Sequence, residues 1–345
     1  MSGPQAIASG GSCAPTDPRV HVRADPGLGG AGAPPTLLVS LIVCTRDRAD
    51  RLERLLVSVG GQEAAPSFEL VVVDNGSRDR TPSLLADFAE AAPFPVVVVR
   101  EPVPGLGRAR NRGVAAARGR LVAFTDDDCR LPPRHLAAVA EAFDDLAVAW
   151  LGGRILADDG PQARVALLED TTFRYFPPGG IVWVGAVQGA NLAVERAALL
   201  SVGGFDPRLG AGTEFRCEDV DLCARLVAAG YVGARCPDLV VFHAHGRDAV
   251  AAGANDAAND VARGAFVAER LSTGGPDARA YLAAWAAHAA RRWGWRPRNA
   301  ARASAATARE LRGALRWRSA GARAPGPAAD RRPTGLSPSP AGNRP

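Results

Sequence analysis

The sequence predicts an α/β fold in which helices flank a doubly wound, mainly parallel sheet. Two observations predict it. Short, almost wholly apolar runs alternate with segments of helical periodicity between residues 37 and 125, and this β-α-β-α-β order is typical of parallel sheets whose strands are buried on both faces. Polar clusters follow three of the apolar runs, at the position where sheets of this kind bind their ligands.

The first half of the chain supplies most of this pattern. Its apolar runs predict strands, and the spacing of apolar residues between them predicts helices. The predicted strands are Leu37–Cys44, Glu69–Val73, Pro95–Arg100 and Arg120–Thr125. The predicted helices are one that Asp50 can cap, residues 79–90 and Gly107–Arg118.

The second half alternates less regularly. Ala149–Ile155 and Leu239–Phe242 predict strands, and Asp219–Ala229 predicts a helix with apolar residues on one face. Residues 256–271 and 277–318 are rich in Ala and Arg and predict further helices. We therefore expect the sheet to be followed by a helical C-terminal region.

Composition divides the chain into four parts. Residues 1–35 and 321–345 are rich in Gly, Pro and other small residues, and we expect disordered tails because such segments cannot bury enough apolar area to order themselves. Residues 36–248 would form the α/β domain, and residues 249–320 a helical C-terminal extension.

Charge and cysteine content limit the class of protein. Residues 291–345 contain thirteen Arg and two acidic residues, so the preceding body is net acidic although the whole chain carries +5. An acidic body argues against a nucleic-acid-binding core. No apolar run reaches the length of a transmembrane helix, and the six cysteines include no CxxC pair. We therefore expect reduced thiols and a cytoplasmic protein.

The basic C-terminal helices allow two interpretations. Leu282, Trp285 and Trp293 lie on one predicted helical stripe, and Leu311 and Leu315 oppose several Arg positions. Basic faces opposite Trp and Leu are typical of helices that lie on anionic membranes, which would place the protein at the inner face of a membrane. The alternative is a helix packed on the α/β domain with a solvated Arg face. The absence of Lys from the whole chain favours the alternative, because it shows a general bias toward Arg.

Three consecutive aspartates follow the strand that ends at Thr125. Buried carboxylates without a counter-charge are costly, and Mg²⁺ or Mn²⁺ supplies that charge while binding carboxylate and phosphate oxygens. Asp126, Asp127 and Asp128 therefore predict a metal clamp on a diphosphate. The alternative is a solvated turn that caps a helix, but the position at a strand end favours the metal site.

Three further sites are open to a functional and a structural interpretation. Asp74 ends the second strand, where it can accept hydrogen bonds from a ribose or a base or close an Asx turn. Glu218 and Asp219 open a helix, either as a general base or because acidic residues favour helix N-termini. His243 and His245 follow the last strand and either ligate a metal or are structural.

Together these segments resemble the family 2 glycosyltransferases, which have the GT-A fold. The order and approximate spacing of the motifs match over about residues 37–245. The matching stretches are Val39–Arg48, Leu70–Asp79, Gly105–Gly119, Leu121–Asp128, Gly189–Val194, Gly203–Asp206 and Glu218–Leu222.

The resemblance assigns roles to individual residues. On the nucleotide-sugar side it places Thr45, Arg46, Asp74, Arg110, Asn111, Asp126 and Asp127. It implies a metal held by Asp128, Asp126 and His243, with Gly189 and Asn191 on the acceptor side. Asp219 would be the general base, with Glu218 beside it.

The resemblance also implies a reaction. The protein would transfer a sugar from a nucleotide-diphosphate sugar to the hydroxyl of a glycan, lipid-linked or small-molecule acceptor, in the biosynthesis of the cell envelope or of glycoconjugates. The family inverts the anomeric centre, so we expect a single metal-assisted displacement. The C-terminal helices lack the apolar spans of processive family members, and we therefore expect single transfers.

Two other functions use part of the same chemistry. A nucleotidyltransferase or other phosphoryl-transfer enzyme also relies on aspartates and a metal, but it would want a Lys or a Gly-rich phosphate loop at the first strand end, and neither is present. An inactive nucleotide-sugar-binding module would need the aspartate cluster alone, and the presence of Asp219 argues against it.

Overall fold

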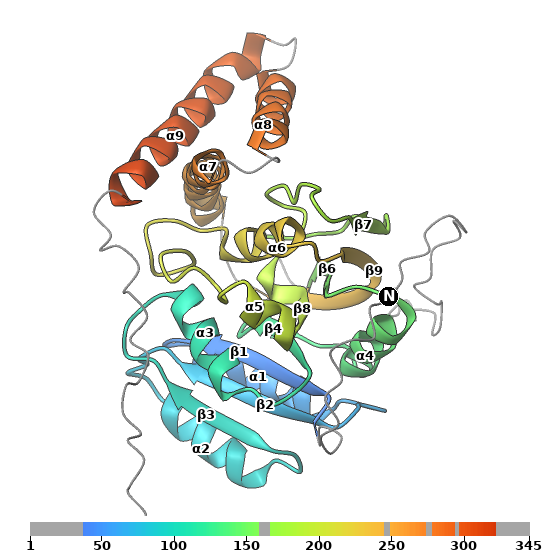
Figure 1. The fold of residues 1–345 in the computed structure, drawn as a ribbon. Helices are drawn as coiled ribbons and strands as arrows, with labels where there is room; N and C mark the ends of the chain where they lie inside the picture. The colour runs from blue at the N-terminus through green and yellow to red at the C-terminus, as the bar shows by residue number, and fades with distance from the viewer. Residues whose placement is uncertain (1–36, 159–165, 245–248, 274–277, 294–296, 322–345) are drawn as a thin grey trace, which may run out of the picture.

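The computed structural model describes residues 37–158, 166–244, 249–273, 278–293 and 297–321 (Figure 1). The two predicted tails lie outside the described residues, except for Gly321. One mixed sheet with helices on its faces forms the α/β part, and three long helices follow it. The predicted fold class is therefore confirmed.

The first half of the chain forms the predicted parallel layer. Its strands are β1 (Val39–Thr45), β2 (Phe68–Asp74), β3 (Val96–Arg100) and β4 (Leu121–Asp126). Its helices are α1 (Ala49–Gly60), α2 (Thr81–Ala91) and α3 (Leu106–Ala116). β1 pairs in parallel with both β2 and β4, and β2 pairs in parallel with β3. The carboxyl ends of these four strands therefore lie at one edge of the sheet.

The first helix is capped differently from the prediction. Arg48, not Asp50, occupies the cap position, and the backbone N–H of Ala49 donates to Asp79 Oδ2 at 3.1 Å. Asp50 forms an ion pair with Arg80 at 2.8 Å. The prediction of Asp50 as the cap was wrong because a carboxylate from the next βα loop supplies the acceptor that a local cap provides in other helices.

The second half completes a mixed sheet with the order β3-β2-β1-β4-β8-β6-β9-β5, and β7 pairs with β9. Its strands are β5 (Cys129–Arg130), β6 (Trp150–Ala157), β7 (Arg174–Phe176), β8 (Leu192–Glu195) and β9 (Gly233–His243). β8 is antiparallel to both β4 and β6, whereas β9 is parallel to β6. The predicted strand Leu239–Phe242 is thus the second part of a longer strand.

Three helical segments of the second half lie among these strands. They are α4 (His135–Asp145), α5 (Arg196–Ser201) and α6 (Glu218–Ala228), and a short 3-10 turn, η1, spans Gly189–Asn191. The sequence predicted α6 within one residue at each end, but it did not predict α4, α5 or η1.

The two faces of the sheet are buried against different helices. Along β1, Leu41 and Val43 belong to one apolar core and Ile42 to the other, as the alternation of side chains along a strand requires. The first core includes apolar residues of α1, α2 and α4, and the second includes residues of α3, α5 and α6. The sheet is therefore covered on both faces, and its strand-end edge is left for the loops.

The C-terminal helices are α7 (Ala249–Ser272), α8 (Ala278–Trp293) and α9 (Pro297–Gly321). The predicted helical stretch 277–318 is thus two helices. α9 packs closely against α7. A Cβ added at Gly264 would lie 1.7 Å from the carbonyl oxygen of Glu310, and one added at Gly313 would lie 1.9 Å from that of Val261. Leu282, Leu311 and Leu315 remain exposed, whereas Arg309 bonds to Asp260 of α7 at 2.8 Å. This contact agrees with helices packed on one another.

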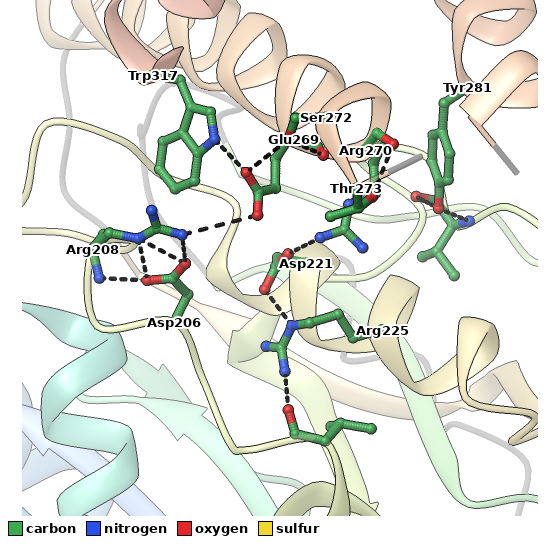
Figure 2. A network of polar contacts seen from close by, with 12 residues as sticks. Asp206, Arg208, Asp221, Arg225, Glu269, Arg270, Ser272, Thr273, Tyr281 and Trp317 are labelled. Atoms are coloured by element: carbon green, nitrogen blue, oxygen red, sulfur yellow. Dashed lines mark hydrogen bonds and ion pairs between the residues drawn. The ribbon is translucent and has the colours of Figure 1, made fainter. Parts of the chain in front are cut away.

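A polar network joins these helices to the α/β part (Figure 2). Arg270 of α7 donates to Asp221 of α6 at 2.9 Å, and both side chains are buried. Glu269 accepts from Trp317 of α9 at 2.6 Å and lies 3.9 Å from Arg208. The hydroxyl of Tyr281 on α8 accepts from the backbone N–H of Val182 at 3.1 Å. The C-terminal helices are therefore integral to the folded body.

Two chain-wide expectations can be compared with the described residues. No helix among them is long and apolar enough to cross a membrane.

Cys44, Cys129, Cys217 and Cys223 are free thiols, but Cys236 is disulfide-bonded. The prediction that every cysteine is reduced was therefore wrong at Cys236, because the absence of a CxxC pair does not exclude a disulfide.

The contact between α7 and α9 should not tolerate a single added methyl group. We expect Gly264→Ala to lower the free energy of unfolding by about 1–3 kcal/mol, because the helices must move apart to relieve the overlap. Denaturant unfolding of the full chain measures the change. Gly60→Ala is the matched control, since a Cβ there meets nothing within 4 Å. Equal stability of Gly264→Ala and the wild type would contradict the close packing of the two helices.

Candidate functional site

Three strand ends bring the predicted polar clusters together. Thr45 at the end of β1 is in register with Asp74 at the end of β2. On the other side of β1, Cys44 is in register with Asp126 at the end of β4. The parallel pairing of these strands therefore places the three clusters at a single edge, as the sequence predicted.

Asp127 is buried beneath this edge. Its Oδ2 accepts from the Thr45 hydroxyl at 2.8 Å, and its Oδ1 accepts from Arg48 Nη1 at 2.8 Å. Burial raises the pKa of Asp127 to about 6, although Arg48 opposes this. The carboxylate faces the first βα loop, so it holds Thr45 and Arg48 in place.

Asp128 lies among positive and hydrogen-bonding groups. Its Oδ1 is 2.9 Å from His243 Nε2, and its Oδ2 accepts from Arg48 at 3.1 Å and from Arg51 at 3.4 Å. Burial alone would raise the pKa of Asp128, but the hydrogen bond and charge of His243 together with the two guanidinium groups lower it to about 2. Asp128 is therefore ionised at neutral pH.

The end of β4 and the end of β9 meet at a cluster with the chemistry of a metal site. Asp128, Cys129 and His243 each offer a ligand atom, and these atoms lie within 4.8 Å of one another. Burial raises the pKa of the Cys129 thiol well above its usual range, so the anionic ligand in the cluster is the carboxylate. Asp126 is next to the cluster and is partly exposed. Carboxylates with one imidazole suit Mg²⁺ or Mn²⁺.

Arg110 connects this edge to the start of α6. Its Nη1 donates to Glu218 Oε1 at 2.7 Å, and its Nη2 donates to Asp126 Oδ1 at 3.3 Å. The guanidinium lies flat against the backbone of Gly189, where a Cβ would be 2.3 Å from Nη2. Gly189 is therefore required by the close approach of Arg110, and both are needed to bring β4 and α6 together.

Asp219 is the second acidic residue at the start of α6 and is half-buried. Its Oδ2 accepts from the backbone N–H of Gly189 at 2.7 Å, and its Oδ1 accepts from that of Val220 at 2.7 Å. Burial raises the pKa of Asp219, and Arg110 with the two N–H groups opposes the rise. Burial and the charge of Asp219 also raise the pKa of Glu218. Both carboxyl groups thus hold protons more readily than exposed ones.

A cleft of about 550 Å³ contains these groups. One wall carries the strand-end residues, and the opposite wall carries the start of α6 and part of α7. Among the residues that line it are Thr45, Arg46, Arg48, Asp126, Asp127, Asp128, Arg216, Glu218, Asp219, His243, Asn259 and Arg263. The cleft is therefore acidic around Asp126, Asp127 and Asp128, and arginine side chains lie on both sides of these carboxylates.

Several predicted residues support the cleft from behind and do not line it. Asp74 accepts from the backbone N–H of Ser77, three residues further on, at 2.7 Å, so its carboxylate stabilises the loop after β2. The amide of Asn111 exchanges two hydrogen bonds with the backbone of Phe205. The amide of Asn191 donates to two carbonyl groups, those of Arg154 and Leu239. Arg110 is buried behind the cleft as well.

Four arginines of the cleft region were missed by the sequence analysis. Arg48 and Arg51 face the aspartate cluster from the first βα loop and α1, and Arg216 and Arg263 line the opposite wall. The matched stretch that ends at Arg48 was the available signal for the first of them. No signal of spacing or motif points to Arg263, which lies on a helix far along the chain.

The comparisons with known sequences agree with these motifs. Residues 40–180 match the sequence model of glycosyl transferase family 2. A pre-mycofactocin glycosyltransferase of Mycobacterium tuberculosis is 32% identical over 214 residues, which cover 60% of this chain and 43% of the relative. Glycosyltransferase AglE of Haloferax volcanii is 26% identical over 206 residues, which cover 59% of this chain and 66% of the relative. The chain thus spans less than two thirds of either relative.

Solved structures share the fold over a larger part of the chain. The mannosyltransferase PcManGT of Pyrobaculum calidifontis, in complex with GDP-Man and Mn²⁺, is 25% identical with a TM-score of 0.58, over 84% of this chain and 81% of that one. TarS of S. aureus is 18% identical with a TM-score of 0.55, over 76% and 45%, and shows the fold alone. The strand-end motifs, the family match and the shared fold lead to one conclusion. Residues 40–180 of the chain match glycosyl transferase family 2, and the α/β part has the GT-A fold.

Proposed function

We propose that this protein transfers a sugar from a nucleotide-diphosphate sugar to an acceptor hydroxyl, with inversion and with the help of a divalent metal, and that Asp219 is the general base. One observation carries the proposal. Arg110 joins Asp126 to Glu218, so the acidic edge of the sheet and the start of α6 face one cleft, and Asp219 lines that cleft. Donor and acceptor would meet between these walls.

The donor side of the proposal rests on the strand-end residues. Asp128, Asp126 and His243 would hold Mg²⁺ or Mn²⁺, because the first two are carboxylates beside the cleft and the third is an imidazole 2.9 Å from Asp128. A bound divalent cation stabilises the negative charge that develops on the departing diphosphate. Arg48 and Arg51 add positive charge at the same wall, and Thr45 and Arg46 would contact the nucleoside. PcManGT was solved with a nucleotide sugar and Mn²⁺.

The acceptor side rests on the different surroundings of Glu218 and Asp219. Glu218 is buried, and its Oε1 accepts from Arg110 at 2.7 Å, so its carboxylate is engaged in that ion pair. Asp219 is fixed by two backbone N–H groups, and its carboxylate stays within the cleft. We therefore assign proton abstraction from the acceptor hydroxyl to Asp219, and the positioning of Arg110 to Glu218.

The two thiols of the cleft do not favour a covalent intermediate on cysteine. Cys44 and Cys217 both line it. Burial raises the pKa of the Cys44 thiol to about 12 and that of Cys217 well above its usual range. Neither thiol therefore supplies a thiolate at neutral pH. The acceptor hydroxyl, deprotonated by Asp219, would attack the sugar directly and invert its anomeric centre.

The first prediction from this proposal concerns the metal. UDP or GDP should bind at least about ten-fold more tightly with Mn²⁺ than with EDTA, and Asp128→Ala should remove that difference, because Asp128 provides an ionised ligand. Calorimetry with both nucleotides measures the affinities. Asp144→Ala is the control, since that side chain is 74% exposed on α4. A nucleotide affinity that ignores both EDTA and Asp128→Ala would contradict the metal site.

The second prediction concerns the base. Asp219→Asn should lower the kcat of donor hydrolysis by about 10²–10⁴ while the Kd of the donor nucleotide changes little, because Asn cannot accept a proton. Since burial raises the pKa of Asp219, the wild-type rate should fall as the pH falls, with a midpoint above the ordinary value of about 4 for Asp. A pH-rate profile beside kcat and Kd measures both effects.

Glu218→Gln is the matched control for Asp219→Asn. It removes the partner of the buried Arg110, so its main effect should be a lower melting temperature. The assignment of the base is refuted if Asp219→Asn turns over at the wild-type rate. If Glu218→Gln loses turnover at an unchanged melting temperature, the two roles are exchanged.

A further inference from the structure

The cleft extends beyond Asp219 to the first C-terminal helix. α7 contributes Asn259 and Arg263 to its wall, and the segment before α6 contributes Arg216. Asn259 and Arg263 are four residues apart on α7, so their side chains share one face of the helix. Arg216 Nη1 donates to Asn259 Oδ1 at 3.3 Å. Two guanidinium groups and an amide therefore form a polar wall on the acceptor side of the cleft.

Two buried carboxylates fix the position of Arg263. Its Nη1 donates to Asp260 Oδ1 at 3.0 Å and to Glu310 Oε1 at 2.8 Å. Both contacts use Nη1, so neither carboxylate contacts the edge of the guanidinium that Nε and Nη2 form. Nε is buried and has no hydrogen-bond partner among the residues that the structure describes. Buried polar groups are almost always satisfied in folded proteins, and an exception indicates a missing ligand, water or ion.

The two carboxylates do not satisfy the Nε–H of Arg263. Asp260 also accepts from Arg309 at 2.8 Å, and Glu310 accepts from Trp285 Nε1 at 2.8 Å. Both carboxylates therefore have other donors, while the Nε–H of Arg263 gains nothing from either. The Nε–Nη2 edge of a guanidinium presents two parallel donors, which match the two oxygens of a carboxylate or phosphate.

We propose that Arg263 and Arg216 form a subsite for an anionic group of the acceptor, a phosphate or a carboxylate. This inference rests on the proposed function, because it assigns the class of acceptor that the transferase would use. An anion held at this wall would orient the remainder of the acceptor toward Asp219, which lines the same cleft. A neutral sugar needs no pair of guanidinium groups, so the subsite favours acceptors that carry a negative charge.

The test is calorimetric titration of the full chain with inorganic phosphate and with acetate, in the presence of saturating UDP or GDP and Mn²⁺ so that the donor side is occupied. We expect the wild type to bind at least one of the anions, and the stronger one identifies the group. Arg263→Gln and Arg216→Gln should each weaken that binding by about ten-fold or more. Arg312→Gln, on an exposed position of α9, should bind like the wild type.

Two further measurements keep the outcomes distinct. Melting temperatures show whether Arg263→Gln folds, and the half-buried Arg216 provides the test if it does not. A repeat of the titration without nucleotide tests the subsite even if UDP and GDP fail to bind, and that failure would count against the proposed function. The subsite is overturned if the wild type binds neither anion, or if both variants bind as tightly as the wild type.

Discussion

The buried guanidinium of Arg110 is the interaction on which the arrangement of the cleft depends. It is the counter-charge of Glu218 and also contacts Asp126, so it joins the end of β4 to the start of α6. A buried charge without its partner is strongly destabilising. Moving the two walls apart would separate Arg110 from Glu218, so the folded state itself keeps the walls at this spacing. The place of Asp219 in the cleft follows from that spacing, since Glu218 precedes it and is held by Arg110.

The C-terminal helices support the same wall from the other side. Arg270 of α7 neutralises Asp221, which lies in the first turn of α6 (Figure 2). Tyr281 of α8 holds Val182, just before the segment that contributes Val184 and Gly185 to the cleft. The helices that the sequence presented as an extension are therefore part of the structure that positions the start of α6.

The sequence predicted the parallel half of the sheet because each buried strand is a short apolar run and each run ends in a polar cluster. It did not predict β5 and β7, which are two and three residues long, since so few residues carry no periodicity. The aspartates were found because a strand end marks them. Arg263 was not, because its position depends on the packing of α7 against α9, which supplies Glu310, and that packing leaves no local pattern. Likewise, the pairing of Arg110 with Glu218 joins residues 108 positions apart.

The most direct measurement of the central interaction is a double-mutant cycle on unfolding free energy at pH 8, with Arg110→Met, Glu218→Gln and the combined variant. We predict that Arg110→Met costs about 3–5 kcal/mol, because it leaves Glu218 buried without its counter-charge. Glu218→Gln on that background should recover at least about 1 kcal/mol, so the two changes should not be additive. Additive losses, or an Arg110→Met variant as stable as the wild type, would contradict the account of Arg110 as the residue that holds the two walls together.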